Sequence, residues 1–210
     1  MEHEQALARC QENDPGGPGA ANVWEAYAAM EAAEGHPARA AMVLERAESE
    51  GCCLHERIWI THSDLLMAGM SAKRQEATLT ERAVRNLPWS AELWCRRLRS
   101  LERSSERSVD DPEGLSAVRS AWRAALASAL PSPDGYVAVL LAYCACHRRR
   151  FKTAMDTAAV ASAAAAGGTI GPAQPPLSRG IGEGVVTTLE GMRGAFEEAE
   201  AFVDKVLICV

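Results

Sequence analysis

One sequence pattern occurs twice in this chain, as VWEAYAAMEAAEGHPARAAMVLERA (residues 23–47) and as IWITHSDLLMAGMSAKRQEATLTERA (residues 58–83). Each copy opens with an aliphatic residue and a tryptophan and closes with Glu-Arg-Ala. A third copy is split into LWCRRLRSLER (93–103) and AVRSAWRAAL (117–126), with Arg123 and Ala124 in the place of the Arg-Ala pair. The chain therefore contains an internal repeat.

The spacing of the tryptophans sets the period of this repeat. Trp24, Trp59 and Trp94 lie 35 residues apart. Periods of about 30 to 50 residues are typical of stacked helix pairs, because one pair cannot bury its apolar face without neighbours. Chance spacing in an ordinary helical bundle explains the pattern less well, since several positions recur together. The sequence therefore predicts an all-α solenoid of antiparallel helix pairs.

Composition agrees with a helical fold. Ala, Leu, Glu and Arg are abundant, aromatic residues are only 5% of the 210, and no run of alternating β-branched residues occurs. The 22 basic and 28 acidic residues give a formal charge of -6. This charge argues against a nucleic-acid footprint over the whole surface, so any such binding is expected to be local.

The N-terminal sequence and the cysteines favour the cytosol or nucleus. The start MEHEQALARC carries acid where a signal peptide needs base, and no apolar run is long enough for a membrane span. Seven cysteines without framework spacing fit reduced thiols in the cytosol or nucleus. The apolar end VLICV is typical of a truncated product.

Breaker residues divide the chain into four regions. Residues 1–22 are predicted to be a leading helix and a Pro/Gly linker, with Asn22 as the N-cap of the first repeat helix. Residues 23–151 hold about three and a half helix pairs, residues 152–184 an Ala/Gly/Pro-rich disordered insertion, and residues 185–207 a helix that completes a fourth repeat.

Helix ends within the repeats follow from Gly, Pro and Ser. The first pair is expected at residues 23–34 and 37–50, with Gly35 ending one helix and Pro37 in the first turn of the next. Further helices are expected at 71–86, from 111 to 130, and from 132 to about 149, and Pro88 and Ser90 mark the start of the third unit.

Each tryptophan is expected to fill the groove between its own helix pair and the next. Tyr27, three residues after Trp24, lies on the same helix face and can pack beside it. The structural positions of the repeat are predicted to be Trp24, Tyr27, Trp59, Trp94, Arg46, Arg82 and Pro88.

These residues resemble the half-a-TPR (HAT) repeat of RNA-processing proteins. The shared features are the tryptophan, an aromatic residue three positions on, and a later Glu-Arg-Ala followed by proline. The stretches 35–47, 81–94 and 134–143, with the basic run HRRRF (147–151), resemble in particular the HAT-repeat recycling factors of the U4/U6 small nuclear ribonucleoprotein. The resemblance covers about residues 23–151 and, more weakly, 189–202.

The resemblance implies a nuclear scaffold in pre-mRNA splicing that binds splicing or RNP proteins, self-associates through its repeats, and contacts RNA indirectly. It implies no cofactor, no small-molecule substrate and no membrane contact. The chain departs from the family pattern at His62 and Arg97, which replace the aromatic residue, and at Leu140, which stands at the expected fourth tryptophan. Those repeats are expected to pack less tightly. RNA-recognition modules of the family have no counterpart in this sequence.

A stripe of arginines is the main candidate binding site. Its members, Arg96, Arg99, Arg103 and Arg107, share one helical face and are candidates to contact RNA or an acidic partner. Glu102 and Glu106 neutralise part of this stripe, which favours a solvated face.

Other motifs give weaker signals. Cys144, Cys146 and His147 lack a fourth ligand at zinc-site spacing, and GIGEG (180–184) misses the spacing of a phosphate loop. No nucleophile with a base and an orienting acid is recognisable, so no enzyme activity is expected.

Three functional hypotheses remain. The first is the non-catalytic splicing scaffold. The second is a direct RNA binder that uses the arginine stripe. The third is a HAT scaffold of mRNA 3′-end formation or ribosomal RNA processing.

Overall fold

The computed structural model describes residues 5, 8–9, 16–68, 73–105, 112–167 and 189–202. In these residues the regular elements are helices, and no strand occurs among them. They are α2 (Pro18–Ala33), α3 (Pro37–Ser49), the short 3-10 helix η1 (Cys52–Leu54), α4 (Glu56–Ala68), α5 (Lys73–Asn86), α6 (Ala91–Ser105), α7 (Pro112–Ala127) and α8 (Pro133–Gly167). A last helix covers residues 189–202. The predicted all-α class is confirmed.

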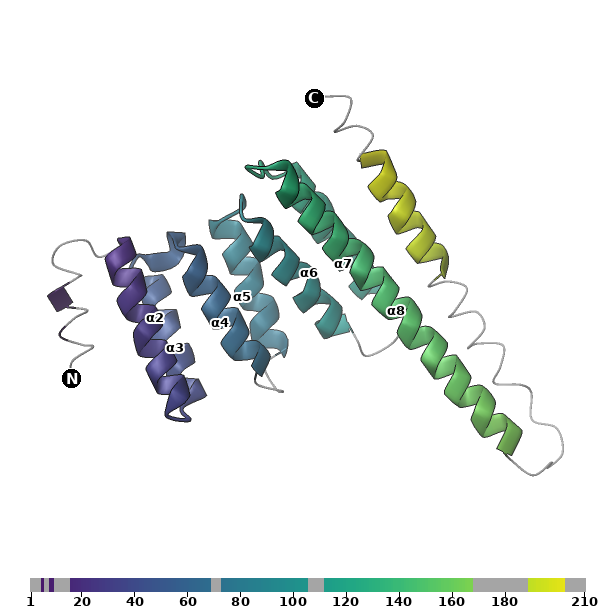
Figure 1. Cartoon of the computed structure of the whole chain (residues 1–210), viewed down its shortest axis with the longest axis horizontal. Coiled ribbons are helices and arrows are strands. Elements are labelled where there is room, and N and C mark those ends of the chain that lie inside the picture. The colour runs from purple at the N-terminus through teal and green to yellow at the C-terminus, as the bar shows by residue number, and fades with distance from the viewer. Residues whose placement is uncertain are drawn as a thin grey trace.

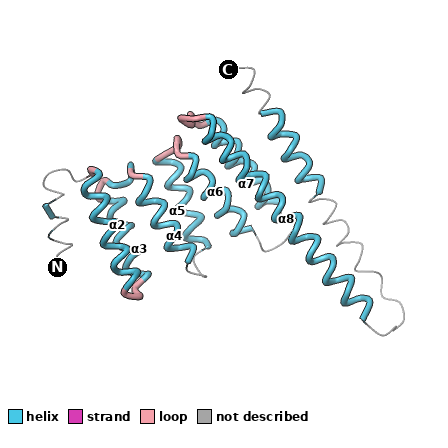
Figure 2. Tube along the Cα trace, in the orientation of Figure 1, coloured by secondary structure: helices cyan, strands magenta, loops and turns pink. Residues whose placement is uncertain are grey.

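The helices stack as antiparallel pairs in two rows (Figure 1). Helices α2, α4, α6 and α8 form one row, in which each contacts the next, and α3, α5 and α7 form the second row. Each second-row helix contacts both its own partner and the following first-row helix. The turn after α2 lies at one edge of the array, whereas the turns before α4, α6 and α8 lie at the opposite edge (Figure 2). This arrangement is the predicted helical-repeat solenoid.

The end of α2 and the starts of α3 and α6 lie where the sequence predicts them. Gly35 has a φ of 84°, and the amides of Gly35 and His36 donate to the carbonyls of Ala32 and Glu31. This is the Schellman closure of α2, and Pro37 then opens α3 at a position that needs no amide hydrogen. At the third unit, the Ser90 hydroxyl accepts from the amide of Leu93, 3.1 Å away, and so caps α6.

Two predicted boundaries are wrong. Helix α2 begins at Pro18 with Gly17 as its N-cap, so Asn22 lies inside the helix rather than capping it. Proline suits the first helical position, and Ala20 and Ala21 are buried against the core. The helix therefore begins at Pro18, before the expected start at residue 23.

Helix α8 also exceeds its expected end near residue 149. It continues to Gly167, because residues 152–167 are rich in alanine, the best helix former. This part of the expected insertion is therefore helical, and residues 168–184 lie outside the described residues. The expected helix at 185–207 is described only over 189–202, where it is helical.

The repeated tryptophans form the core. Trp24, Trp59 and Trp94 are 0%, 2% and 7% exposed. The indole Nε1 of Trp59 donates to the carbonyl of Cys53 at 2.8 Å, and that of Trp94 donates to the carbonyl of Pro88 at the same distance. The ring and its N–H therefore tie α4 and α6 to the turns that precede them, whereas the buried indole N–H of Trp24 in α2 makes no such bond.

The fourth unit carries a tyrosine at the tryptophan position. Ser132 caps α8 as Ser90 caps α6, and Tyr136 follows Ser132 by four residues as Trp94 follows Ser90. The Tyr136 hydroxyl donates to the carbonyl of Ser128 at 3.1 Å, which reproduces the bond to the preceding turn. The assignment of this position to Leu140 is wrong, because Tyr136 has the same place relative to the capping serine as Trp94.

Candidate functional site

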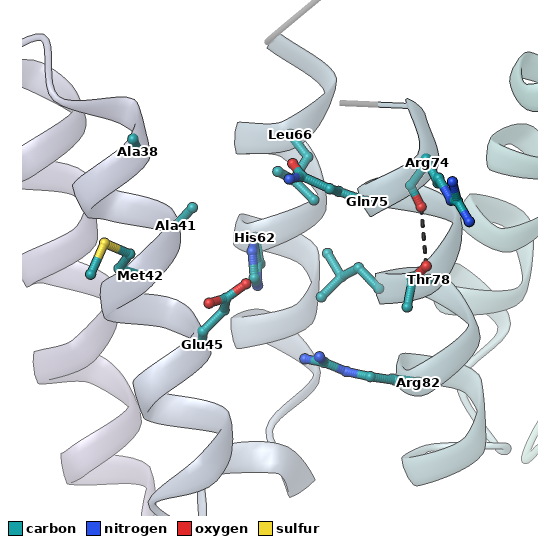
Figure 3. Close-up of a pocket in the computed structure, with 11 residues that line it drawn as sticks. Ala38, Ala41, Met42, Glu45, His62, Leu66, Arg74, Gln75, Thr78 and Arg82 are labelled. Carbon is teal, nitrogen blue, oxygen red and sulfur yellow. Dashed lines mark hydrogen bonds between the residues drawn. The ribbon is translucent and has the colours of Figure 1, made fainter. Parts of the chain in front are cut away.

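A groove opens where α3 and α5 flank α4, and we call it the α3–α5 groove. It encloses about 510 Å³ and is lined by Ala38, Ala41, Met42 and Glu45 of α3, His62 and Leu66 of α4, and Arg74, Gln75, Thr78, Leu79 and Arg82 of α5. In Figure 3, Met42 and Glu45 lie on one wall, Arg82 reaches in from the other, and His62 lies between them. The groove is thus built from three helices of two successive repeats.

The lining suits a protein segment better than a polar small molecule. The Met42 side chain is 67% exposed, and Leu66 and Leu79 supply further apolar surface between the helices. Charged groups lie at the rim, where Glu45, Arg74 and Arg82 are all exposed. An apolar floor with a polar rim is the arrangement in which a partner's side chain gains affinity by burial and specificity from the rim.

A buried charge network stabilises the groove. The Glu48 carboxylate, on a side chain only 6% exposed, lies 2.8 Å from His62 Nδ1 and also accepts from the Arg82 guanidinium. Glu48 comes from α3, His62 from α4 and Arg82 from α5. The three groups therefore fix two successive repeats relative to each other, because breaking a buried pair leaves an uncompensated charge.

The two polar residues that replace the repeat's aromatic position both reach back to the preceding repeat. His62 contacts Glu48 of α3, and Arg97 donates to the carbonyl of Ala77 of α5 at 2.5 Å and pairs with Glu81 at 3.3 Å. Packing at His62 is not loosened, since that residue is 2% exposed. Inter-repeat hydrogen bonds take the place of aromatic packing at these positions.

The groove has a counterpart in the first repeat. There, Trp24, Tyr27 and Glu31 of α2 and Arg39, Met42, Val43 and Arg46 of α3 line a hollow of about 350 Å³. Tyr27 holds the position of His62, and Arg46 holds that of Arg82. In the third repeat Arg97 holds the position of His62 and contacts the Ala77 carbonyl of α5. The wider, two-walled groove is thus the one between α3 and α5.

The arginine of Glu-Arg-Ala has a specific packing role. The guanidinium carbon of Arg46 lies 5.1 Å from the ring centre of Trp24, and that of Arg82 lies 5.6 Å from the ring centre of Trp59. Each arginine therefore covers the tryptophan of its own unit by a cation–π contact. In the third unit Arg123 instead pairs with Glu198 of the last helix, at 3.2 Å.

The arginine stripe is largely neutralised within the fold. Arg96 pairs with Asp64 of α4 at 2.5 Å and with Glu92 at 2.8 Å. Burial lowers the pKa of Arg96, but its bonds to Asp64 and Glu92 outweigh this effect and raise it. Arg103 pairs with Glu76 at 3.3 Å.

The remaining stripe positions differ from these two. Arg99 is exposed and lines a smaller hollow of about 240 Å³ between α6 and α8. Arg107 lies outside the described residues. The acids that neutralise the stripe come mainly from neighbouring helices. Glu102 of the same helix pairs elsewhere, and Glu106 lies outside the described residues.

Glu102 pairs with the basic run of α8. Arg149 donates two hydrogen bonds to the Glu102 carboxylate, at 2.8 and 2.5 Å. Burial opposes the charge, but these bonds raise the pKa of Arg149. The basic run HRRRF therefore contributes at least one structural arginine to the interface between α6 and α8.

Cys146 and His147 of α8 are buried, whereas Cys144 is half-buried. Burial raises the pKa of Cys146 to about 12, and burial lowers the pKa of His147 to about 4. His147 packs edge-on against Tyr143, with ring centres 4.7 Å apart, and Tyr143 stacks on Trp122 at 4.4 Å. These residues form an aromatic cluster between α7 and α8.

One group of ligand-type side chains lies close together among the described residues. Glu31, Glu34 and His36 gather at the turn after α2, with His36 Nδ1 3.7 Å from Glu31 and 3.8 Å from Glu34. Contacts of the His36 ring with the two carboxylates account for this arrangement. The GIGEG motif lies outside the described residues.

The sequence did not reveal the groove. Met42, Glu48, Leu66 and Leu79 read as ordinary helix residues, and only the position of His62 at the repeat's aromatic site pointed toward the contact between repeats. The other lining residues could not be grouped from the sequence, because α3 and α5 are far apart along the chain. Among the described residues, no helix is both long and apolar enough to cross a membrane.

Comparison with known proteins gives relatives for part of the chain. No protein-family model matches the sequence. Spliceosome associated factor 3, U4/U6 recycling protein, of Mus musculus is 31% identical over 134 residues, which are 64% of this chain and 13% of the relative. The Homo sapiens and Danio rerio proteins of the same name are 36% and 38% identical over 80 residues, which are 38% of this chain and 8% of each relative.

The match is therefore local in both directions, since the aligned parts span about an eighth or less of these relatives. The predicted resemblance to U4/U6 recycling factors is confirmed over the aligned residues. Over the aligned residues, this chain is similar to spliceosome associated factor 3, U4/U6 recycling protein.

Proposed function

We propose that this chain is a non-catalytic helical-repeat scaffold of pre-mRNA splicing, which binds partner proteins during assembly or recycling of the U4/U6 small nuclear ribonucleoprotein. Its relatives carry the name of a U4/U6 recycling protein, which supports a splicing-related role in the nucleus. The observation that carries the binding role is the α3–α5 groove, with the exposed Met42 on its wall.

The geometry of the groove supports a protein partner. A helix or extended peptide laid along α4 would cover Met42 and Leu66 and meet the charged rim. Because the buried Glu48 network fixes α3 and α5, the groove is preformed and little ordering is needed on binding. Truncation of a central apolar contact commonly costs a partner more affinity than changes at the rim do.

Direct RNA binding has less support. Of the three described stripe arginines, Arg96 and Arg103 pair with acids of neighbouring helices. RNA phosphate would have to displace those carboxylates. Salt-dependent RNA binding that is lost when Arg96, Arg99 and Arg103 are all changed to Ala would favour the RNA hypothesis instead.

A matched pair of variants tests the groove. The chain is purified from nuclear extract as wild type, as Met42→Glu and as Leu54→Glu, and the recovered proteins and small RNAs are identified together. Leu54 is 64% exposed, close to the 67% of Met42, but it lies in η1 outside the groove. We expect U4/U6 components with wild type and Leu54→Glu, and their loss with Met42→Glu.

Three results would contradict parts of the proposal. Recovery of cleavage-factor or pre-ribosomal components would assign the chain to mRNA 3′-end formation or ribosomal RNA processing. Equal recovery of U4/U6 components by both variants would leave the splicing role but remove the groove as its binding site. A fluorescent fusion that stays outside the nucleus would contradict the nuclear assignment.

A further inference from the structure

The α3–α5 groove has a smaller ring on its floor than the equivalent hollow of the first repeat. Equivalent repeat positions line both, and two of these positions lie on the first helix of each pair. They hold Tyr27 and Glu31 in the first repeat, and His62 and Leu66 in the second. An imidazole is shorter than a phenol, and the groove, at about 510 Å³, is larger than the hollow of about 350 Å³. The groove therefore has room where the repeat before it holds a tyrosine ring.

His62 brings an unpaired ring nitrogen to this room. Its Nδ1 lies 2.8 Å from the Glu48 carboxylate, and Nδ1 carries the hydrogen because a carboxylate only accepts. Its Nε2 has no hydrogen-bond partner among the described residues. Unlike Nε2 of His147, this atom is not sealed from solvent, and His62 lines the groove although its side chain is only 3% exposed. A buried ring that Glu48 holds in place therefore directs one unpaired nitrogen into the groove.

The side chains around His62 suit an aromatic ring. Leu66 and Leu79 line the groove from α4 and α5, and Met42, which is 67% exposed, lines it from the opposite wall on α3 (Figure 3). A thioether makes favourable contacts with an aromatic ring, and the leucines offer apolar surface that a ring would remove from water. The room beside His62 is thus apolar except for Nε2.

The charges near the groove do not favour a charged occupant. Glu45 on one wall and Arg74 on the other are exposed and have opposite signs. The Arg82 guanidinium already donates to the buried Glu48 carboxylate behind the lining. These charges balance, so a charged group beside His62 would lose its hydration without gaining a matching counter-ion. The occupant is therefore expected to be neutral.

A tyrosine side chain combines the required ring with the required polar group. Its hydroxyl both donates and accepts, so it can bond Nε2 whether the imidazole is neutral or protonated, whereas an indole N–H only donates. A phenylalanine would cover Nε2 and leave it without a partner, which costs affinity. Tyrosine is also the residue that the first repeat holds at this position, as Tyr27.

We propose that the α3–α5 groove binds a tyrosine side chain of the partner protein, with the tyrosine hydroxyl hydrogen-bonded to Nε2 of His62. The ring takes the place of the aromatic residue that the second repeat lacks. This inference rests on the proposed function of the groove as a partner site, and it assigns the side chain that the partner inserts there. His62 then determines specificity, and Glu48 positions its ring.

The test compares two soluble probes, N-acetyl-tyrosinamide and N-acetyl-phenylalaninamide, which differ by one hydroxyl. The 210-residue chain carries isotope-labelled methionine methyl groups, and the NMR signal of Met42 is identified by its loss in Met42→Leu. The shift of this signal with probe concentration gives each dissociation constant. We expect the tyrosine probe to bind at least about fivefold more tightly, a difference of about 1 kcal/mol. A groove that offers only apolar contacts would instead favour the more apolar phenylalanine probe.

Substitutions of His62 isolate the role of Nε2. His62→Asn keeps an N–H donor for Glu48 but removes Nε2, so the preference for the tyrosine probe should disappear. His62→Tyr places the chain's own phenol in the groove, so the tyrosine probe should no longer shift the Met42 signal. Leu54→Glu, outside the groove, should leave both affinities unchanged. Circular dichroism checks the fold of each variant, and the comparison of the two probes on wild type needs no variant.

Three outcomes would overturn the proposal. They are a Met42 signal that the tyrosine probe does not shift, equal or tighter binding of the phenylalanine probe to wild type, and a tyrosine preference that His62→Asn leaves unchanged.

Failure of the proposed function is measured separately, by recovery of U4/U6 components from nuclear extract. If Met42→Glu loses these components but wild type shows no tyrosine preference, the groove holds its partner by other chemistry and only the tyrosine proposal fails. If wild type shows the preference but Met42→Glu keeps the components, the tyrosine site stands and the groove is not where U4/U6 components bind.

Discussion

Replacement of Trp59 by alanine should destabilise the whole array, and the size of the loss follows from the structure. Trp59 is 2% exposed, so nearly all of its side chain is removed from water. Burial of about 150 to 250 Å² at about 25 cal/mol/Å² contributes on the order of 4 to 6 kcal/mol gross. Because the site relaxes in part, we expect Trp59→Ala to cost about 3 to 5 kcal/mol.

Two polar contacts add to this cost. The indole N–H donates to the Cys53 carbonyl at 2.8 Å, and the Arg82 guanidinium lies over the ring. Trp59→Phe keeps most of the apolar surface but removes the N–H bond, so we expect a smaller loss of about 1 to 2 kcal/mol. This variant remains measurable if Trp59→Ala does not fold, since domains of this size are stable by only about 5 to 15 kcal/mol.

Trp89 provides the matched control. It is the same residue type in the same array, but it is 51% exposed at the turn before α6. Urea unfolding followed by circular dichroism at 222 nm gives the free energy of unfolding of each variant. We expect Trp89→Ala to lose at most about half of what Trp59→Ala loses. Equal losses would refute the argument that burial at the repeat position holds the array together.

The remaining predictions concern buried charge, pH and thiols. Glu48→Gln removes the buried carboxylate that His62 and Arg82 contact, so the free energy of unfolding in urea should fall by about 3 to 5 kcal/mol. The exposed Glu45→Gln should change it little, and equal effects of the two variants would contradict the role of the network. Because burial lowers the pKa of His147 from 6.5 to about 4, the unfolded chain binds more protons between these values, and stability should fall as the pH falls from about 6.5 to about 4. His147→Asn should flatten this pH dependence, and an unchanged slope would show that other groups cause it. The Cys146 thiol, whose pKa burial raises to about 12, should react with a thiol reagent at pH 8 only after urea unfolding, and prompt labelling in the folded chain would disprove its burial.

Local signals in the sequence determined the helical repeat of this protein. The 35-residue spacing of Trp59 and Trp94 predicted their equivalent burial, and Gly35 and Ser90 predicted helix ends that the structure contains. Helix ends can be predicted from the sequence because a helix cap depends only on residues within one turn. The burial of the tryptophans can be predicted because each repeat places its tryptophan in the same surroundings. The predicted period did not hold at Tyr136, because α6 and α7 are longer than α4 and α5.

Tertiary structure alone decided where the surfaces and charges of the molecule lie. Arg96 belonged to an apparent basic stripe, yet Asp64, 32 residues earlier, neutralises it once α4 and α6 stack. The α3–α5 groove likewise depends on how helices from different repeats are placed. Sequence periodicity fixes which residues share a helix face, but the angle and offset between stacked helices determine which face meets a partner and which face stays open.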